Sequence, residues 1–354
     1  MTRWPQPSLR HLAQLTDDVG IVEHARIGQP RRDLGYCTDD AGRLLGVVTR
    51  CTEQPAARRL ATVALAFLQR AHDCGGTFHL RLGADGRWTD DPPSDDAAGR
   101  ALFGLGTAAS AAPWPEVAAG ALDLFDAAAG FRSPHPRAMA YAALGAVAVL
   151  DVVPGHLRAR GLVDDAAVLL PGPVSDPLWR WPEPRLTYAN GLIPDAALAV
   201  AAVRRDRCQA RDALALLEWL VAEERHEGGR FSFAPVGGRG RGDAKPGFDQ
   251  QPVEAWAMAD ACARAFAHTG DHGWADEVAR AADWFVGDND VAACMFDPTT
   301  GGGFDGLERD GVNRNQGAES TLAFVATMAQ ARAVHRQAQA ASSSRRADRG
   351  LSTP

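Results

Sequence analysis

The sequence predicts an all-α protein, an (α/α)6 toroid in which six inner helices are surrounded by six outer helices. Helical periodicity recurs along the 354 residues, whereas strand-like alternation is scarce. Helices that are apolar on all sides alternate with amphipathic helices that carry charge on one face, as expected for buried and outer positions. Comparable polar turns recur at roughly 56-residue intervals, which indicates a repeated helical hairpin. These turns contain Asp39, Asp95, Arg137, Asn190, Glu254 and Glu319.

The expected elements follow in chain order. An N-terminal outer helix starts at Ser8. Apolar GRLLGVV after two acids predicts an inner helix over 39–50, and RRLATVALAFLQRA an outer one over 58–71. FHLRL and GRW on either side of a Gly-rich turn predict a short hairpin over 77–89. Apolar GRALFGLG and AMAYAALGAVAVL give inner helices, and the amphipathic stretches after them give outer ones. The inner helices are expected at 95–108, 136–151, 189–204, 250–268 and 317–337, and the outer ones at 115–129, 157–169, 207–225 and 273–287.

Composition limits the classes of function. The net charge of −7 gives no basic surplus for binding nucleic acid or an anionic membrane. No apolar run approaches a membrane span, and the N-terminus lacks a signal core, so a cytoplasmic protein is expected. The six cysteines form no CxxC pair and no metal-ligand spacing stands out, so no metal and no cofactor are predicted, although a carboxylate-rich mouth suits Ca²⁺. One domain is expected over 1–338, followed by a disordered polar tail over 339–354.

The turns before the inner helices are the expected site of chemistry, because inner-helix N-termini converge on one mouth of such a ring. Two of these turns, TDDAGR and SDDAAGR, contribute the acid pairs Asp39-Asp40 and Asp95-Asp96. A single such acid is typical of a helix cap. Two acids in a row at two mouths indicate more, because a partly buried carboxyl beside another acid has a raised pKa and suits general acid catalysis.

The later turns add acids, amides, arginines and aromatic groups that suit a carbohydrate pocket. Glu254 and Glu319 occupy like positions in the first turns of their helices, where an acid also complements the helix dipole. Together with the two pairs they are the candidate catalytic residues. Candidate substrate-binding residues are Asp18, His24, Tyr36, Arg43, Arg100, Arg137, Trp181, Tyr188, Asn190, Gln250, Gln251, Asn315 and Gln316.

The segments GYCTDDAGRLL, SDDAAGRALFGLG, FDQQPVEAWAMAD and DGVNRNQGAESTLAF resemble those of a bacterial six-hairpin family. Its members are often called glycosyltransferases, because the module occurs joined to, or near, sugar-transferring domains. The resemblance covers about residues 15–324 and implies the fold of the (α/α)6 glycosidases, in which acids at the inner-helix mouths act on glycosidic bonds. It also implies association with a glycosyltransferase, although nothing in the chain reads as a Rossmann nucleotide-binding unit.

The sequence departs from the family pattern at four positions. Ala41 replaces an Asn, Asp95 a Glu, Ala189 an Asp and Leu192 an Arg. If the Asp missing at Ala189 is catalytic in the family, this chain has lost or relocated that step.

The resulting expectation is a glycoside hydrolase that acts on an oligosaccharide by a two-carboxylate mechanism, with Asp40 or Asp96 paired with Glu254 or Glu319. Two alternatives remain open. A sugar isomerase or epimerase would use histidines, for which His24, His135 and His226 are the candidates. A non-catalytic glycan-binding or glycosyltransferase-associated module would bind sugar without turnover.

Overall fold

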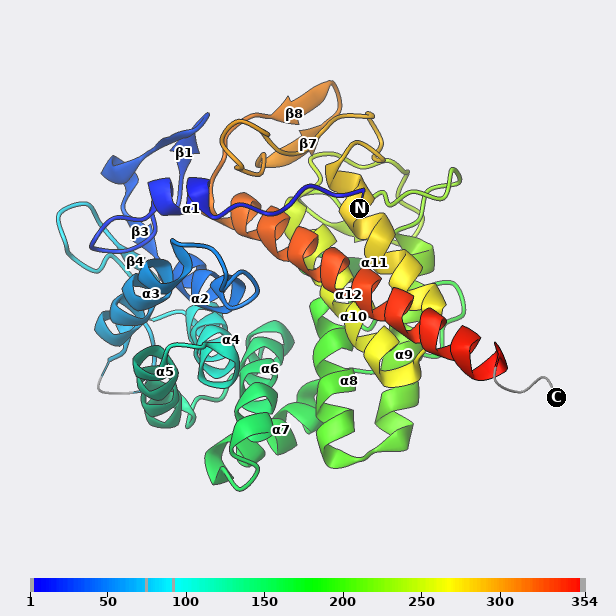
Figure 1. Cartoon of the computed structure of the whole chain (residues 1–354), viewed down its shortest axis with the longest axis horizontal. Coiled ribbons are helices and arrows are strands. Elements are labelled where there is room, and N and C mark those ends of the chain that lie inside the picture. The colour runs from blue at the N-terminus through cyan, green and yellow to red at the C-terminus, as the bar shows by residue number, and fades with distance from the viewer. Residues whose placement is uncertain (1–2, 74–75, 91–92, 351–354) are drawn as a thin grey trace.

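A computed structural model describes residues 3–73, 76–90 and 93–350, with side chains to residue 341. Six of its helices form a closed inner ring, in which each contacts the next and the last contacts the first. The colours of Figure 1 therefore run once around the molecule and return to the N-terminal elements. The inner helices are α2 (Thr38–Val48), α4 (Asp95–Ala111), α6 (Pro136–Val152), α8 (Leu192–Arg204), α10 (Pro252–Thr269) and α12 (Ala318–Gly350).

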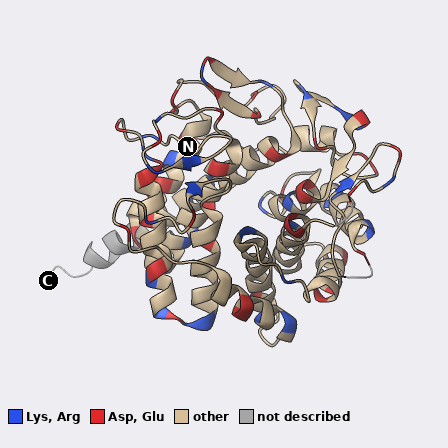
Figure 2. Cartoon of the chain, turned by 180° about the vertical axis from the view of Figure 1, so that it is seen from behind, with Lys and Arg blue, Asp and Glu red and all other residues tan. Residues whose placement is uncertain are grey.

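Six further helices pack on the outside of this ring. In α3, Leu60 and Leu68 are buried against the ring while Arg58 and Arg59 face solvent, as the amphipathic pattern predicts. Figure 2 shows that both signs of charge are spread over the outer helices and loops. No helix in the described ranges is long and apolar enough to cross a membrane. The outer helices are α1 (Arg10–Leu15), α3 (Ala57–Ala71), α5 (Pro115–Ala128), α7 (Leu157–Leu169), α9 (Arg207–Glu223) and α11 (His272–Phe285).

Glycines allow the inner helices to approach closely. A Cβ added at Gly145 of α6 would lie 2.1 Å from the carbonyl oxygen of Leu102 in α4, and one at Gly106 would lie 2.1 Å from the carbonyl oxygen of Gly145. Any side chain at these positions would push the two helices apart. The surplus of Ala and Gly in the inner helices therefore sets the spacing of the ring.

Short antiparallel strand pairs lie in the loops that lead into the inner helices. The pairs are β1 (Ala25–Arg26) with β2 (Gln29–Pro30), β3 (Tyr36–Cys37) with β4 (Arg81–Leu82), β5 (Arg185–Leu186) with β6 (Arg239–Gly240), and β7 (Gly306–Glu308) with β8 (Gly311–Asn313). A short 3-10 helix, η1 (Arg32–Leu34), precedes β3. The hairpin expected over 77–89 is only partly correct, because β4 pairs with β3 and touches its own segment through one bridge, Leu82 to Trp88.

Three inner-helix boundaries differ from the sequence prediction by three residues or more, and the first of these is the end of α4 at Ala111 instead of residue 108. The helix expected from residue 189 begins at Leu192, because Ala189 has a positive φ of 46° and the Asn190 side chain accepts a hydrogen bond from the Thr187 amide, which forms a turn. The last helix continues beyond residue 337 to Gly350, in a segment rich in the helix formers Ala, Gln and Arg. The division at residue 338 and the disorder of the tail stay predictions, and residues 351–354 lie outside the described residues.

Candidate active site

The first turns of α2, α4 and α12 meet around a cavity of about 430 Å³, called here the mouth cavity. Two inner-helix starts bring the predicted acids Asp39, Asp40 and Asp96 to this cavity, and Glu319 arrives from the start of α12. Carboxylates at helix N-termini are favoured by the helix dipole. The cavity is lined by Glu23, His24, Cys37, Asp39, Asp40, Arg43, Leu80, Arg81, Asp96, Arg100, Tyr188, Gln251, Asp305, Gly317, Glu319 and Ser320.

The β3–β4 pair fixes the start of α2 at the mouth cavity. The Thr38 amide donates to the carbonyl of Leu80 at 2.8 Å, and the Thr38 hydroxyl donates to the carbonyl of His79 at 2.5 Å. Tyr36 and Cys37 pair with Leu82 and Arg81 directly before this point. These hydrogen bonds attach the backbone directly before Asp39 and Asp40 to the β4 segment.

Arg43 connects two candidate catalytic acids from opposite ends of the sequence. Its guanidinium donates through Nη1 to Asp40 Oδ1 at 2.8 Å and through Nη2 to Glu319 Oε2 at 2.5 Å. The side chains of Arg43 and Asp40 are each 4 % exposed, whereas that of Glu319 is 37 % exposed. One carboxyl is thus buried in the cavity wall and the other reaches into the open cavity.

The two carboxyls also differ in electrostatic environment. Burial raises the pKa of Asp40 from 3.8 to about 7, because the charged form loses its water. Arg43 opposes this shift, while the negative charges of Glu319, Glu23 and Asp39 add to it. Asp40 therefore holds a proton close to neutral pH, as a general acid must.

Arg100 forms a second cluster of ion pairs in the mouth cavity, beside the one that Arg43 forms with Asp40 and Glu319. Its Nη1 lies 2.6 Å from Asp39 Oδ2 and 3.4 Å from Asp96 Oδ2, which also accepts a hydrogen bond of 2.7 Å from the Tyr188 hydroxyl. Burial, followed by the charge of Asp96, raises the pKa of Tyr188, so this hydroxyl stays a donor. The two acid pairs of the sequence are joined through this arginine.

A wider cavity of about 630 Å³, the side cavity, shares Asp96 and Tyr188 with the mouth cavity. Asp95 and Arg137 both line this cavity. Asp95 accepts a 2.6 Å hydrogen bond from the Ser133 hydroxyl, and Arg137 donates two hydrogen bonds to Glu183. Its lining is Pro93, Ser94, Asp95, Asp96, His135, Pro136, Arg137, Glu183 and Tyr188. The two cavities are therefore neighbours along this shared wall.

Sequence reasoning missed two acids that line the mouth cavity, Glu23 and Asp305, and one acid outside both linings, Asp249. Asp305 lines the cavity and accepts 2.8 Å bonds from the Gly317 amide and the Ser320 hydroxyl, and burial raises its pKa. Glu23 pairs with Arg81 at the rim. Asp249 stands two residues before Gln251, and burial, with the nearby charge of Glu308, raises its pKa to about 6. The motif FDQQ was the available signal for Asp249, while Asp305 stands in a glycine-rich loop without a distinguishing pattern.

Glu254, one of the predicted catalytic acids, lies outside the linings of both cavities. It is 2 % exposed and accepts hydrogen bonds from the amides of Ala189 and Asn190 and from Asn190 Nδ2. Burial raises its pKa to about 7, and the bonds from Asn190 and Ala189 oppose that shift. Glu254 therefore anchors the turn before α8. Asn190, predicted to bind substrate, is fully buried in the same anchor.

Two more predicted sugar-binding residues are buried in the protein interior. Trp181 is 1 % exposed, donates to Glu183 and stacks near Trp219, so its ring face is not presented to a ligand. Gln250 has no exposed surface and is held between the Phe233 amide and Asp290.

Four more predicted substrate-binding residues lie outside both linings, and three of them form hydrogen bonds to loop residues. The Tyr36 hydroxyl donates to Asp17, whereas Asp18 is exposed. The Asn315 side chain accepts from the Ile27 amide, and Gln316, 1 % exposed, accepts from Thr300. The predicted residues brought to either cavity are Asp39, Asp40, Asp95, Asp96, Glu319, His24, Arg43, Arg100, Arg137, Tyr188 and Gln251.

Within the described ranges, no group of three or more His, Cys, Asp or Glu side chains is placed to hold a metal ion. The side chains that line the two cavities carry carboxylates, arginines, the Tyr188 hydroxyl, the Gln251 amide and the imidazoles of His24 and His135.

The fold is the (α/α)6 toroid, which it shares with solved enzymes that act on sugars. A cellobiose 2-epimerase from Bacillus thermoamylovorans B4167 has a TM-score of 0.69 at 13 % identity, over 93 % of this chain and 96 % of that one. A cellulase of C. cellulolyticum in complex with cellobiose has a TM-score of 0.63 at 10 % identity, over 88 % and 87 %.

An alpha-mannanase of Bacteroides thetaiotaomicron has a TM-score of 0.60 at 12 % identity, over 92 % of this chain and 94 % of that one. No family model matches the sequence. No curated protein matches it either. These neighbours include both hydrolases and epimerases, so the shared fold alone does not choose between the two reactions.

Proposed function

We propose that the protein is a glycoside hydrolase that cleaves an uncharged oligosaccharide in the mouth cavity. The observation that carries this proposal is the Arg43-bridged pair of Asp40 and Glu319, one buried with a pKa of about 7 and one partly exposed. Glycoside hydrolysis needs two carboxyl groups in different protonation states on the two sides of the scissile bond. Environments that push two carboxyls apart in pKa are the usual means of assigning these roles.

In the proposed reaction, Asp40 donates its proton to the glycosidic oxygen as the bond from that oxygen to the anomeric carbon breaks. Glu319 accepts a proton from water, whose oxygen forms the new bond to the anomeric carbon. Arg43 then stabilises the newly formed Asp40 carboxylate, to which it already donates a hydrogen bond. At the end of the cycle Asp40 takes up a proton from solvent and Glu319 releases one to solvent, so that water is the only molecule consumed besides the saccharide.

The charges of the mouth cavity favour an uncharged substrate. Arg43, Arg81 and Arg100 all line the cavity, and each is paired with a carboxylate of the protein. No arginine of this lining is left over to neutralise a phosphate or a carboxylate on the sugar. Hydroxyl groups, in contrast, find acceptors in the carboxylates and in the Tyr188 hydroxyl oxygen, and a donor in the Gln251 amide.

A second candidate, sugar epimerisation, is favoured by His24, an imidazole that lines the mouth cavity. His135 lines only the side cavity, and His226 lies outside both linings. A mechanism that removes and returns a proton needs a base on each face of the sugar. With one imidazole in the mouth cavity, the second base would have to be a carboxylate such as Asp305.

The test is turnover of a panel of gluco-, manno- and galacto-configured disaccharides and nitrophenyl glycosides. Asp40→Asn and Glu319→Gln should each lower kcat by about 10²–10⁴-fold, since each removes one proton-transfer group. Asp33→Asn, at an exposed acid outside both linings, is the matched control and should retain activity. Full activity in both site variants would overturn the assignment, and binding without turnover by the unaltered protein would indicate a glycan-binding module.

A further inference from the structure

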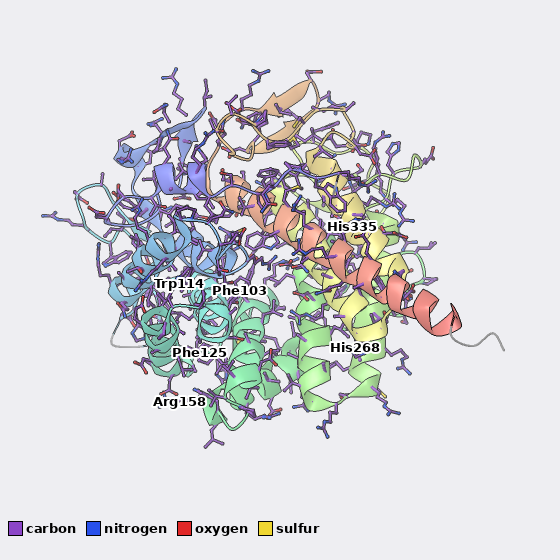
Figure 3. The ribbon with its side chains drawn as sticks, viewed as in Figure 1. Phe103, Trp114, Phe125, Arg158, His268 and His335 are labelled. Atoms are coloured by element: carbon purple, nitrogen blue, oxygen red, sulfur yellow. The ribbon has the colours of Figure 1, made fainter. Side chains whose placement is uncertain are left out.

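A third cavity of about 300 Å³, called here the lumen cavity, lies between the inner helices and has exposed Ala267 and Gln337 in its lining. Its walls come from α4, α6, α8, α10 and α12 and from Arg50, just after α2. The guanidinium of Arg100, which lines the mouth cavity, lies 5.1 Å from the ring of Tyr141, which lines the lumen cavity. The linings of the two cavities share no residue. In Figure 3, Phe103, another lining residue, lies toward the middle of the ring, whereas Arg158 points away at the periphery.

One wall of the lumen cavity is polar. Asp260 accepts two hydrogen bonds from Arg50, at 2.7 and 2.6 Å, and one of 2.7 Å from Trp256 Nε1. Beside it, Arg264 of α10 pairs with Asp195 of α8, whose side chain is 5 % exposed. These four charges form two neutral pairs, so the wall offers directional hydrogen-bonding groups without net charge.

The other wall is apolar and partly aromatic. It is formed by Phe103, Tyr141, Leu144, Leu192 and Val253. The rings of Phe103 and Tyr141 meet edge to face at 5.8 Å. An apolar, aromatic wall that faces a few fixed polar groups is the usual composition of a small-molecule site.

Stability alone gives a weak reason for the two ion pairs. Helix α8 reads LIPDAALAVAAVR, so Asp195 is a lone acid on a helix that is otherwise apolar along its buried length. Burial of such charges costs free energy that their attraction recovers only in part, and apolar replacements of buried pairs are often neutral or stabilising. Burial also raises the pKa of Asp195, which reports the same cost. The proposed hydrolysis uses none of these four residues.

We infer that the lumen cavity binds an uncharged pyranose-sized polyol at a site distinct from the mouth cavity. A pyranose has an apolar C–H face, which suits the aromatic wall, and hydroxyl groups, which suit Asp260, Arg50 and Gln330. A purely apolar ligand would strip water from the ion pairs without replacing its hydrogen bonds. A charged ligand would find no unpaired opposite charge among the lining residues.

The test measures binding to the full chain labelled with 5-fluorotryptophan. Trp256 lines the cavity, and its ¹⁹F resonance is assigned by loss of one signal in Trp256→Phe. Methyl α-D-glucopyranoside, methyl α-D-mannopyranoside and methyl β-D-galactopyranoside are the probes. At least one should shift this resonance saturably, with a dissociation constant of about 1 mM or lower. The shift should persist in Asp40→Asn, because the readout needs no turnover and the mouth cavity lies beyond Arg100.

Two blocking variants make the site assignment falsifiable. Ala263→Phe fills the cavity from α10, and Gln337→Trp covers it from an exposed position on α12, which avoids disturbing the core. Each should abolish the shift. The inference is overturned if no pyranoside shifts the Trp256 resonance, if indole shifts it and the pyranosides do not, or if the shift survives both blocking variants. Because binding is read without hydrolysis, an inactive mouth cavity would leave this result unaffected.

Discussion

Replacement of Asp40 by asparagine should change how the stability of the protein depends on pH. In the folded protein, burial raises the pKa of Asp40 from 3.8 to about 7, so protons bind the folded state more tightly than the unfolded state. The contribution of Asp40 to the free energy of unfolding is therefore greatest below about pH 4. It falls as the pH rises toward about 7 and is constant above that value.

The magnitude follows from the size of the pKa change. A rise from 3.8 to about 7 corresponds to about 4 kcal/mol across this pH range. The asparagine introduced by Asp40→Asn has no such titration and can still accept the hydrogen bond from Arg43. The difference in unfolding free energy, wild type minus Asp40→Asn, should therefore fall by about 4 kcal/mol between about pH 4 and about pH 8.

The assay is urea-induced unfolding followed by circular dichroism at a series of pH values for both proteins. Asp33→Asn is the control, because a hydrogen bond from Arg31 holds the pKa of exposed Asp33 below its ordinary value. The difference in unfolding free energy between wild type and Asp33→Asn should therefore stay nearly constant from about pH 4 to about pH 8, and should fall only as the pH drops below about 4. Parallel pH curves for wild type and Asp40→Asn would refute the argument that Asp40 is protonated near neutrality.

Two predictions concern the packing and the anchor of the mouth. Gly145→Ala should lower the free energy of unfolding by about 1–3 kcal/mol or more, because the added Cβ would lie 2.1 Å from the Leu102 carbonyl oxygen. Gly130→Ala, with no heavy atom within 4 Å of the added Cβ, should change it by less than about 0.5 kcal/mol in the same denaturation experiment, and equal effects would contradict the close approach of α4 and α6. Glu254→Ala should cost about 3 kcal/mol or more, since it leaves two amides and the Asn190 side chain without their acceptor. Glu254→Gln should cost less, and an unchanged midpoint in Glu254→Ala would contradict the anchoring role.

Much of the fold follows from local sequence signals. Apolar all-round helices that alternate with amphipathic ones predict the ring, and the structure confirms the expected order of inner and outer helices. The paired acids in the first turns of α2 and α4 carry their own signal, because two adjacent carboxyls at a helix start exceed what capping requires. Asp39, Asp40 and Asp96 all reach the mouth cavity.

The remaining features depend on contacts between distant segments. Glu254 and Glu319 stand at like positions of their helices, but only Glu319 reaches the cavity, because the turn at Ala189 and Asn190 folds over Glu254. Asp305 becomes part of the site by accepting from Gly317, a contact that no local pattern reports. Trp181 is buried and donates a hydrogen bond to Glu183, another contact that the sequence pattern does not report.

The most direct test of the central claim is a proton NMR time course of oligosaccharide turnover in deuterated water. Hydrolysis assisted by Asp40 and Glu319 predicts release of a reducing sugar with no deuterium on its carbon atoms, and loss of that release in Asp40→Asn and Glu319→Gln. Deuterium incorporated beside the carbonyl carbon, with the glycosidic bond intact, would show proton-transfer epimerisation and contradict the account.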